Sequence, residues 1–290
     1  MTRRQFVLAA CGVSTAHGSD QSATLADAPK ADITLRIGEV TLELAPGRLV
    51  KTVAYNGQAP GPVLRVKEGQ STVVDVWNDT AESEMVHWHG LHIPSDVDGA
   101  HEEGTPHIPP HDHRRYTFTP RPAGTRWYHS HGHAGRNLHK TTYSGEFGLC
   151  IVEPKNDPGR YDQEIPIILH EWLPHFTEDM DVAYKLFSIN GKMLGGGEPI
   201  RVRRSQRVLF RILNASATLT HRVALPGHRF SVIALDGNTI PSARSVPVLE
   251  LGPAERADAL VEMDQPGVWI LGETREAQRR AGMGLSLIHI

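Results

Sequence analysis

The chain has 290 residues and a formal net charge of -3, which is too long for one small domain and suits two of ordinary size. Hydrophobic residues make up 39% and charged residues 22%. This composition excludes a disordered chain, and the charge does not favour nucleic acid or an anionic membrane as a partner. The unusual feature is 17 histidines beside 2 cysteines, which indicates metal binding rather than a disulfide framework.

Residues 1–28 are predicted to be an export signal. Arg3 and Arg4 begin a twin-arginine pattern, an apolar stretch follows, and residues 26–28 form a small-residue cleavage site. The expected location is therefore periplasmic or secreted. A lipid anchor at Cys11 and a frayed cytosolic N-terminus are the alternatives. No later stretch has the length and apolar character of a membrane span.

From residue 32 onward the chain has the pattern of short strands separated by turns. Apolar and polar residues alternate clearly at 72–77, and the dipeptides Asn56-Gly57, Asn190-Gly191 and Asp236-Gly237 are typical of hairpin turns. The pattern predicts an all-β chain of Greek-key sandwich or barrel domains. Strands are expected at residues 33–37, 50–55, 71–77, 115–119, 148–153, 164–170, 207–213, 230–235, 257–262 and 268–271.

The sequence also contains an internal repeat. Residues 64–78 and 200–214 share apolar, arginine, glutamine and asparagine positions at a constant offset of 136 residues, which favours one β-fold used twice. The polar segment 154–159 is the expected linker, because it combines proline, glycine and charged residues. Two domains are therefore predicted, at residues 30–155 and 160–285.

Two His-x-His pairs lie in the first repeat, His87-Trp88-His89 and His129-Ser130-His131. Side chains at positions i and i+2 of a strand lie on the same face, about 7 Å apart. Two such pairs on adjacent strands would bring four imidazoles into one space. Imidazole suits copper, zinc, iron and nickel, so the ligand type alone leaves the metal open.

The second repeat does not keep these histidines. The same offset aligns His87 with Val223 and His89 with Leu225, and a looser match places Leu271 at the position of His129. The second copy thus has apolar residues where the first has imidazoles, which argues against histidines that only fill space in the fold.

The two motifs resemble the first-domain copper motifs of multicopper oxidases, on residues 87–91 and 127–131, with residues 56–62 in agreement. The resemblance covers about residues 32–271. It implies tandem cupredoxin-like domains and a copper-dependent oxidoreductase, laccase-like or copper-oxidising. Such an enzyme couples the oxidation of phenols, amines or cuprous ion to the four-electron reduction of oxygen to water. Molecular oxygen and an electron donor of this kind are the partners that it implies.

The resemblance also implies a role for each site residue. His87 would bind the type 2 copper, and the type 3 copper pair would be bound by His89, His129 and His131. Asp98 matches an acid that relays protons to the cluster in related bacterial copper oxidases. The alternative is that Asp98 is only a turn residue before Gly99.

The sequence departs from the family pattern in its second half. Family members use four further cluster histidines, from His-x-x-His-x-His and His-Cys-His motifs in a third domain, and the cysteine also binds the type 1 copper. Neither motif is present in these 290 residues. Residues 282–290 are interpreted as a truncated or shifted reading frame. We expect this chain alone to be inactive, with an exposed histidine surface that a third domain or a second chain completes.

Alternatives follow from the same histidines. One is a non-catalytic periplasmic copper-binding protein, and a zinc site is a more distant third. The proline-rich loop that holds His101, His107, His111 and His113 would be either a solvated loop or an accessory copper site. Cys150 alternates with apolar neighbours and is predicted to be a buried core residue.

Overall fold

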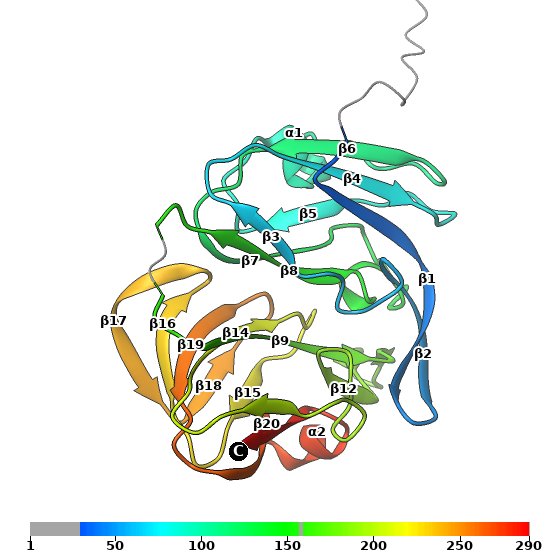
Figure 1. Ribbon diagram of the computed structural model, residues 1–290. Helices are drawn as coiled ribbons and strands as arrows, with labels where there is room; N and C mark the ends of the chain where they lie inside the picture. Colours follow the sequence, from blue (N-terminus) through cyan, green and yellow to red (C-terminus); the bar gives the residue numbers. More distant parts are fainter. Residues whose placement is uncertain (1–29, 157–158, 290) are drawn as a thin grey trace, which may run out of the picture. The chain divides into compact units, whose positions relative to one another are not determined.

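A computed structural model describes residues 30–156 and 159–289. Strands dominate this part of the chain (Figure 1). The all-β prediction is confirmed. Residues from Ala31 onward belong to one compact unit. The predicted export signal and Cys11 lie outside the described residues, as do two positions of the predicted linker.

The first half contains two four-stranded sheets, in the orders β2-β1-β4-β6 and β3-β8-β7-β5. Their short connections include the helix α1 (Ser95–Asp98) and the 3₁₀ helices η2 (His101–Glu103) and η3 (Thr141–Tyr143). The strands are β1 (Ile33–Ala45), β2 (Arg48–Tyr55), β3 (Leu64–Lys67), β4 (Thr72–Asn78), β5 (Val86–His89), β6 (His113–Phe118), β7 (Gly124–Ser130) and β8 (Phe147–Glu153).

The second half contains a six-stranded sheet, β12-β9-β14-β19-β16-β17, a five-stranded sheet, β13-β21-β20-β15-β18, and the pair β10-β11. Its one helix among the described residues is α2 (Glu276–Arg280). The strands are β9 (Gln163–Trp172), β10 (His175–Phe176), β11 (Val182–Ala183), β12 (Leu186–Ile189), β13 (Ile200–Val202), β14 (Arg207–Asn214), β15 (His221–Ala224), β16 (Phe230–Leu235), β17 (Asn238–Val246), β18 (Val248–Leu251), β19 (Arg256–Glu262), β20 (Gly267–Glu273) and β21 (Gly284–His289).

The two halves repeat one strand order, as the sequence repeat predicts. In each half, a parallel pair of strands lies at the edge of one sheet. This pair is β3 with β8 in the first half and β13 with β21 in the second. A second parallel pair lies in the other sheet, β1 with β4 and β9 with β14. The second half adds β16, β17 and β18 to this common pattern. A duplicated cupredoxin-like topology explains the constant offset in the sequence.

Each predicted strand overlaps an observed one, with ends that differ by one residue at 71 and 119, and the predicted turns have the expected backbone. Asn56, Asn190 and Asp236 have φ values of 53°, 53° and 48°, and a glycine of positive φ follows each of them. In β4 every second residue is buried, which matches the alternation at 72–77. Residues 284–289 form β21 between β13 and β20.

One sequence alignment requires correction. Val223, the counterpart of His87, pairs across the strands with Glu273 rather than with Leu271. The looser match aligned Pro-Gly turns, whereas strand pairing sets the register. The second half therefore has a carboxylate, not an apolar side chain, directly opposite Val223. This carboxylate is buried and hydrogen-bonded to His221.

The core comprises three clusters of apolar side chains. One lies within residues 35–152, another within residues 165–287, and the third joins side chains of both halves, including Trp127, Phe147, Ile168 and Trp172. Cys150 is 1% exposed and belongs to the first cluster, as predicted. Burial raises the pKa of its thiol to about 12.

The strand β7 also makes buried polar contacts with the second half. Arg126 is 2% exposed, and its guanidinium donates to the carbonyl oxygens of Asp236 at 2.5 Å and Gly237 at 3.3 Å. The hydroxyl of Thr125 donates to Asp258 Oδ1 at 2.6 Å. These bonds satisfy groups that would otherwise be costly to bury.

Candidate metal centre

The two His-x-His motifs lie on adjacent strands at the edge of one sheet. β5 pairs antiparallel with β7, and His87 lies directly opposite His129. β5 is the edge strand of this sheet. Because alternate residues share a face, His89 falls on the same face as His87, and the position of His131 continues the face of His129.

The imidazoles converge as the motif spacing predicts. His87, His89 and His129 each offer a ring nitrogen, and these atoms lie within 4.8 Å of one another. The closest pair is His89 Nδ1 and His129 Nε2, at 3.3 Å. His131 lies beside this group, with its ring centroid 5.2 Å from that of His87. His131 is exposed and His129 is buried, so only part of the face is open to solvent.

Backbone carbonyls fix the tautomers of two of these rings. His87 Nδ1 lies 2.8 Å from the carbonyl oxygen of Asp98, and His129 Nδ1 lies 2.8 Å from that of Ser130. A carbonyl oxygen only accepts, so Nδ1 carries the proton and donates in both rings. The Nε2 lone pairs of His87 and His129 are therefore available to a metal, an orientation that metal sites commonly use.

The surroundings keep the rings neutral. Burial lowers the pKa of His87, although the Asp98 carboxylate opposes this effect. Burial and then the Arg256 guanidinium lower the pKa of His89 to about 3. Burial, and then the neighbouring His87, lowers the pKa of His129 well below its usual range. Neutral imidazoles are the form that binds metals.

Asp98 lies beside the converging imidazoles. Its Oδ2 is 3.5 Å from His87 Nδ1, at the end of the short helix α1. Gly99 follows in the left-handed region, with a φ of 89°. A Cβ at Gly99 would lie 2.0 Å from the Val86 carbonyl oxygen. The turn and the site thus coincide, because the turn brings Asp98 against the strand that carries His87.

We expect Gly99→Ala to unfold the region around His87. A methyl group there meets the backbone of β5 and also forces alanine into positive φ, which alone costs about 1–3 kcal/mol. The free energy of unfolding should fall by roughly 3 kcal/mol or more in a urea titration. Gly104→Ala is the matched control, since Gly104 has a φ of 108° and no atom near its Cβ. Equal losses in the two variants would contradict the close-approach argument.

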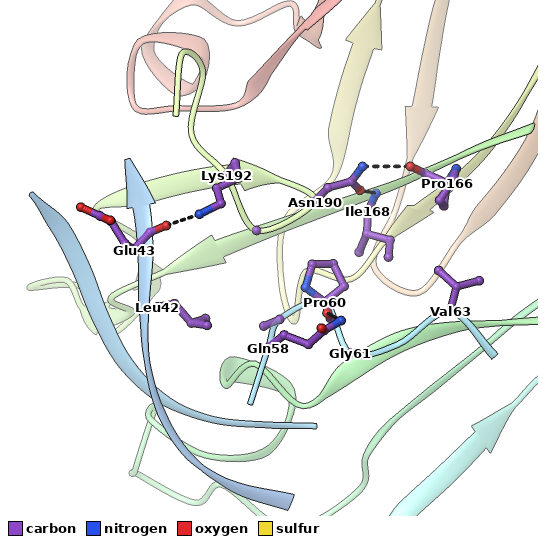
Figure 2. Close-up of a pocket in the computed structure, with 12 residues that line it drawn as sticks. Leu42, Glu43, Gln58, Pro60, Gly61, Val63, Pro166, Ile168, Asn190 and Lys192 are labelled. Carbon is purple, nitrogen blue, oxygen red and sulfur yellow. Dashed lines mark hydrogen bonds between the residues drawn. The ribbon is translucent and has the colours of Figure 1, made fainter. Parts of the chain in front are cut away.

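A cavity of about 240 Å³ opens at the imidazoles. It is lined by His87, His89, Trp127, His129, His131, Thr142, Glu146, Phe147, Ala215, Ser216, Ala217, Pro253 and Ala254. Residues of the second half thus contribute to its wall. The larger cavity in Figure 2, of about 380 Å³, has walls from residues 42–63 and 166–192 and contains none of the predicted site residues.

The sequence reasoning missed one carboxyl group at this cavity, Glu146, and a second beside it, Glu84. Glu146 is 1% exposed and accepts from Ser144 Oγ at 2.8 Å. Burial, and then the nearby Glu84, raises the pKa of Glu146 well above its usual range. Burial raises the pKa of Glu84 to about 7. The sequence contains one signal for Glu146, which is its position as an acidic residue directly before the apolar run 147–152.

We expect Glu146→Gln to stabilise the protein more at pH 8 than at pH 5. The pKa of a glutamate in the unfolded chain is about 4.3. A carboxyl group whose pKa is higher in the folded state destabilises the fold increasingly as the pH rises above that value. Glutamine removes that penalty from Glu146 and its repulsion from Glu84. Urea unfolding at both pH values measures the difference, with exposed Glu39→Gln as the control. The same gain at both pH values would contradict the prediction.

The histidines of the proline-rich loop separate in the structure. His113 belongs to β6 and stacks on Trp77, with ring centroids 4.5 Å apart. His111 is exposed. His101 and His107 remain together, with ring centroids 4.5 Å apart. The predicted loop therefore contains one histidine pair rather than a cluster of four.

The donor set at β5 and β7 fits copper. Neutral imidazole nitrogens within 4.8 Å of one another can share a metal ion after small side-chain movements. The buried Trp127 stacks on His129, with centroids 4.1 Å apart, and limits the freedom of that ring. Among the described residues, this is the one group of three histidines, cysteines or carboxylates with such close ligand atoms.

Comparisons with known proteins give one family. A model described as multicopper oxidase matches residues 36–157, and a second model of the same description matches residues 164–289. The chain is 30% identical to multicopper oxidase MmcO of Mycobacterium tuberculosis, over 88% of this chain and 58% of that protein. It is 26% identical to copper resistance protein A of Escherichia coli, over 79% of this chain and 45% of that protein. The chain thus spans about half the length of the curated relatives it matches.

Solved structures agree with these relatives. The blue copper oxidase from Nitrosomonas europaea matches with a TM-score of 0.80 and 27% identity, over 89% of this chain and 85% of that one. The multicopper oxidase mgLAC matches with a TM-score of 0.78 and 27% identity, again over 89% and 85%. These likenesses extend over both halves of the described fold.

Proposed function

Because the chain belongs to the multicopper oxidase family, we propose that it supplies one half of a trinuclear copper centre. The enzyme would couple substrate oxidation to the four-electron reduction of oxygen to water. The observation that carries this proposal is the convergence of His87, His89 and His129 within 4.8 Å on adjacent strands. The electron donor would be a phenol, an amine or cuprous ion.

Each histidine has a proposed role. His87 would bind the type 2 copper, and His89, His129 and His131 would bind the type 3 pair. The tautomers of His87 and His129 support this assignment, since Nδ1 is engaged by a carbonyl in both. The copper ions, when bound, would accept electrons and pass them to oxygen.

Asp98 is proposed to hold a proton beside the centre. Burial raises the pKa of its carboxyl group, although His87 opposes the effect. Its Oδ2 lies 3.5 Å from His87 Nδ1, and its own carbonyl oxygen accepts the proton of that ring. Asp98 therefore orients the imidazole of His87 and is near enough to exchange a proton with groups at the cavity.

The domain boundaries and the location are parts of the same proposal. Domains at residues 30–155 and 160–285 are supported by sheets that do not share strands. Periplasmic or secreted location is supported by the twin-arginine pattern in the sequence. No helix among the described residues has the length and apolar character needed to cross a membrane.

A non-catalytic copper-binding protein is the second candidate. It is favoured by ligand counting, because these 290 residues contain four of the eight cluster histidines that the family pattern uses and no His-Cys-His motif. A third domain or a second chain would supply the rest in the oxidase. The two candidates differ in one expected result. Only the oxidase should reduce oxygen once the missing histidine and cysteine ligands are supplied.

Oxygen uptake by the copper-loaded chain tests the proposal. The chain alone should bind copper but show no sustained uptake with a phenolic donor or cuprous ion, since no cysteine–histidine site collects the electrons. Addition of a separate polypeptide with the His-x-x-His-x-His and His-Cys-His motifs should produce uptake.

Uptake in the mixture should disappear in His131→Gln and persist in His139→Gln, an exposed histidine outside the cluster. Sustained turnover by a monomer of the chain alone would contradict the half-centre. A mixture that forms a complex but takes up no oxygen would favour the non-catalytic candidate.

A further inference from the structure

We infer that His101, His107 and His133, together with Glu102, form a second metal site that binds a divalent transition metal such as Cu²⁺. The side chains come from two segments, the turn around η2 and the residues after β7. His101 and His107 have ring centroids 4.5 Å apart. His133 Nε2 lies 3.2 Å from Glu102 Oε1. Because Glu102 follows His101 directly, the two pairs are neighbours.

The loop between His101 and His107 is anchored by Thr105, whose amide donates to the Ala100 carbonyl oxygen at 3.1 Å, and by Ile108. The Thr105 hydroxyl donates to the Ser95 carbonyl at 2.6 Å and accepts from the Gly99 amide at 2.9 Å. Ile108 exchanges two backbone hydrogen bonds with Glu84, at 3.0 and 2.8 Å. Thr105 and Ile108 are fully buried. The backbone that carries the two histidines is therefore positioned before any ligand binds, which favours a site.

One ring nitrogen in this group, Nδ1 of His107, is shielded from solvent. It has no hydrogen bond of good geometry within the described structure, although a backbone interaction with Glu84 raises the pKa of the ring. Burial, and then His101 and His133, lowers the pKa of His107 and keeps its imidazole in the form that binds metals.

The ligand set defines the class of metal. Three imidazoles and one carboxylate suit Cu²⁺ or Zn²⁺, and Cu²⁺ binds such sites more tightly than other first-row divalent ions. The side chain of His133 is 83% exposed, so it can turn towards the His101–His107 pair. A metal ion would then replace the contact of His133 with Glu102 and retain the carboxylate as a ligand or as a neighbouring negative charge.

This site is separate from the half-centre but close to it. His133 lies two residues beyond His131 in the sequence, and Glu103 of the same 3₁₀ helix acts electrostatically on His87. No residue of the second site belongs to the converging group at β5 and β7. Removal of one set of ligands should therefore leave the other set intact.

The test uses the full chain with the half-centre disabled by His89→Gln and His129→Gln. Cu²⁺ alone is added, and binding is measured by equilibrium dialysis and electron paramagnetic resonance. We expect one bound Cu²⁺ with nitrogen hyperfine structure. The further changes His101→Gln and His107→Gln should weaken the binding of this Cu²⁺ by at least about tenfold. Loss of a residue that only orients a metal ligand already costs about tenfold, and these changes remove two ligands.

His111→Gln in the same background is the control, since His111 is an exposed histidine of the same loop. It should bind Cu²⁺ as the parent does. His133→Gln, at an exposed position, provides a variant that does not disturb the packed loop and should also weaken binding. The inference is wrong if His133→Gln and the double variant both bind like the parent, or if His111→Gln weakens binding equally.

Discussion

Replacement of His221 by alanine should lower the free energy of unfolding by about 3–5 kcal/mol, the range typical when one partner of a buried ion pair is removed. His221 is fully buried between two carboxylates. Its Nδ1 lies 3.0 Å from Glu273 Oε2, and its Nε2 is hydrogen-bonded to Glu171. Alanine would leave both carboxylates without this cation, although Arg275 Nη2 would remain 3.0 Å from Glu273 Oε2. Urea unfolding at pH 6 measures the loss.

His228→Ala is the matched control for this variant. His228 is 9% exposed and packs on Trp269, but no carboxylate faces it among the described contacts. Its removal should cost only the packing contribution, about 1–3 kcal/mol. Adding Glu171→Gln to His221→Ala should recover part of the loss, because it removes one uncompensated charge. Equal costs for the two histidines would contradict the ion-pair argument.

The same cluster predicts a dependence on pH. Burial alone would lower the pKa of His221, but its hydrogen bonds to Glu171 and Glu273 outweigh this and raise the pKa. Because the pKa of His221 is raised in the folded state, its protonation stabilises the fold. This stabilisation is complete at a pH below about 6.5, the pKa of histidine in the unfolded chain, and is lost as the pH rises through the pKa of the folded state. Wild-type stability should therefore decline from pH 6 to pH 9 more steeply than that of His221→Ala. The groups that face this ring also include Arg275 and Tyr184 near the two carboxylates.

The double change His89→Gln and His129→Gln should weaken copper binding at the half-centre by roughly a hundredfold or more. Changes to groups that only support a ligand cost about 10–100-fold, and this variant removes two ligands. Competition with a chromophoric Cu⁺ chelator measures the affinity. Glutamine keeps a polar side chain of similar length, so the fold of β5 and β7 should be maintained.

His92→Gln and His139→Gln together form the control, because both histidines are exposed and lie outside the converging group. They should leave the affinity of the tightest copper unchanged. Circular dichroism of both variants checks that the fold is intact. An unchanged affinity after loss of His89 and His129 would remove the basis for the half-centre.

Local sequence features predicted much of the fold. The dipeptides at Asn56, Asn190 and Asp236 predicted turns because only a few residue types accept a positive φ. The alternation at 72–77 predicted β4 because one face of the strand is buried. Some of the strands that were missed, such as β3 and β13, are three or four residues long and depend on their neighbours for stability. Another, β17, has nine residues but is largely exposed, so it lacks a clear alternation of buried and exposed positions.

The histidines of the site were predictable for a similar reason. His87 and His89 are two residues apart on one strand, so their common face follows from strand geometry alone. Glu84 and Glu146 were not predictable, because they come together only when segments distant in the sequence fold against each other. Likewise, the pairing of Val223 with Glu273 depends on register, which no turn signal in the sequence defines.

The contacts of β7 with the second half affect how this chain folds during synthesis. Arg126 and Thr125 are made early, but their partners Asp236, Gly237 and Asp258 leave the ribosome more than a hundred residues later. Until then the guanidinium of Arg126 has only water and the nearby carbonyl oxygens of Pro122 and Ala123 as partners. Domains generally fold in order from the N-terminus during translation. Here the buried polar contacts of β7 with the second half form only after the second half has been translated, so release of the nascent chain before residue 258 would leave Thr125 and Arg126 without these partners.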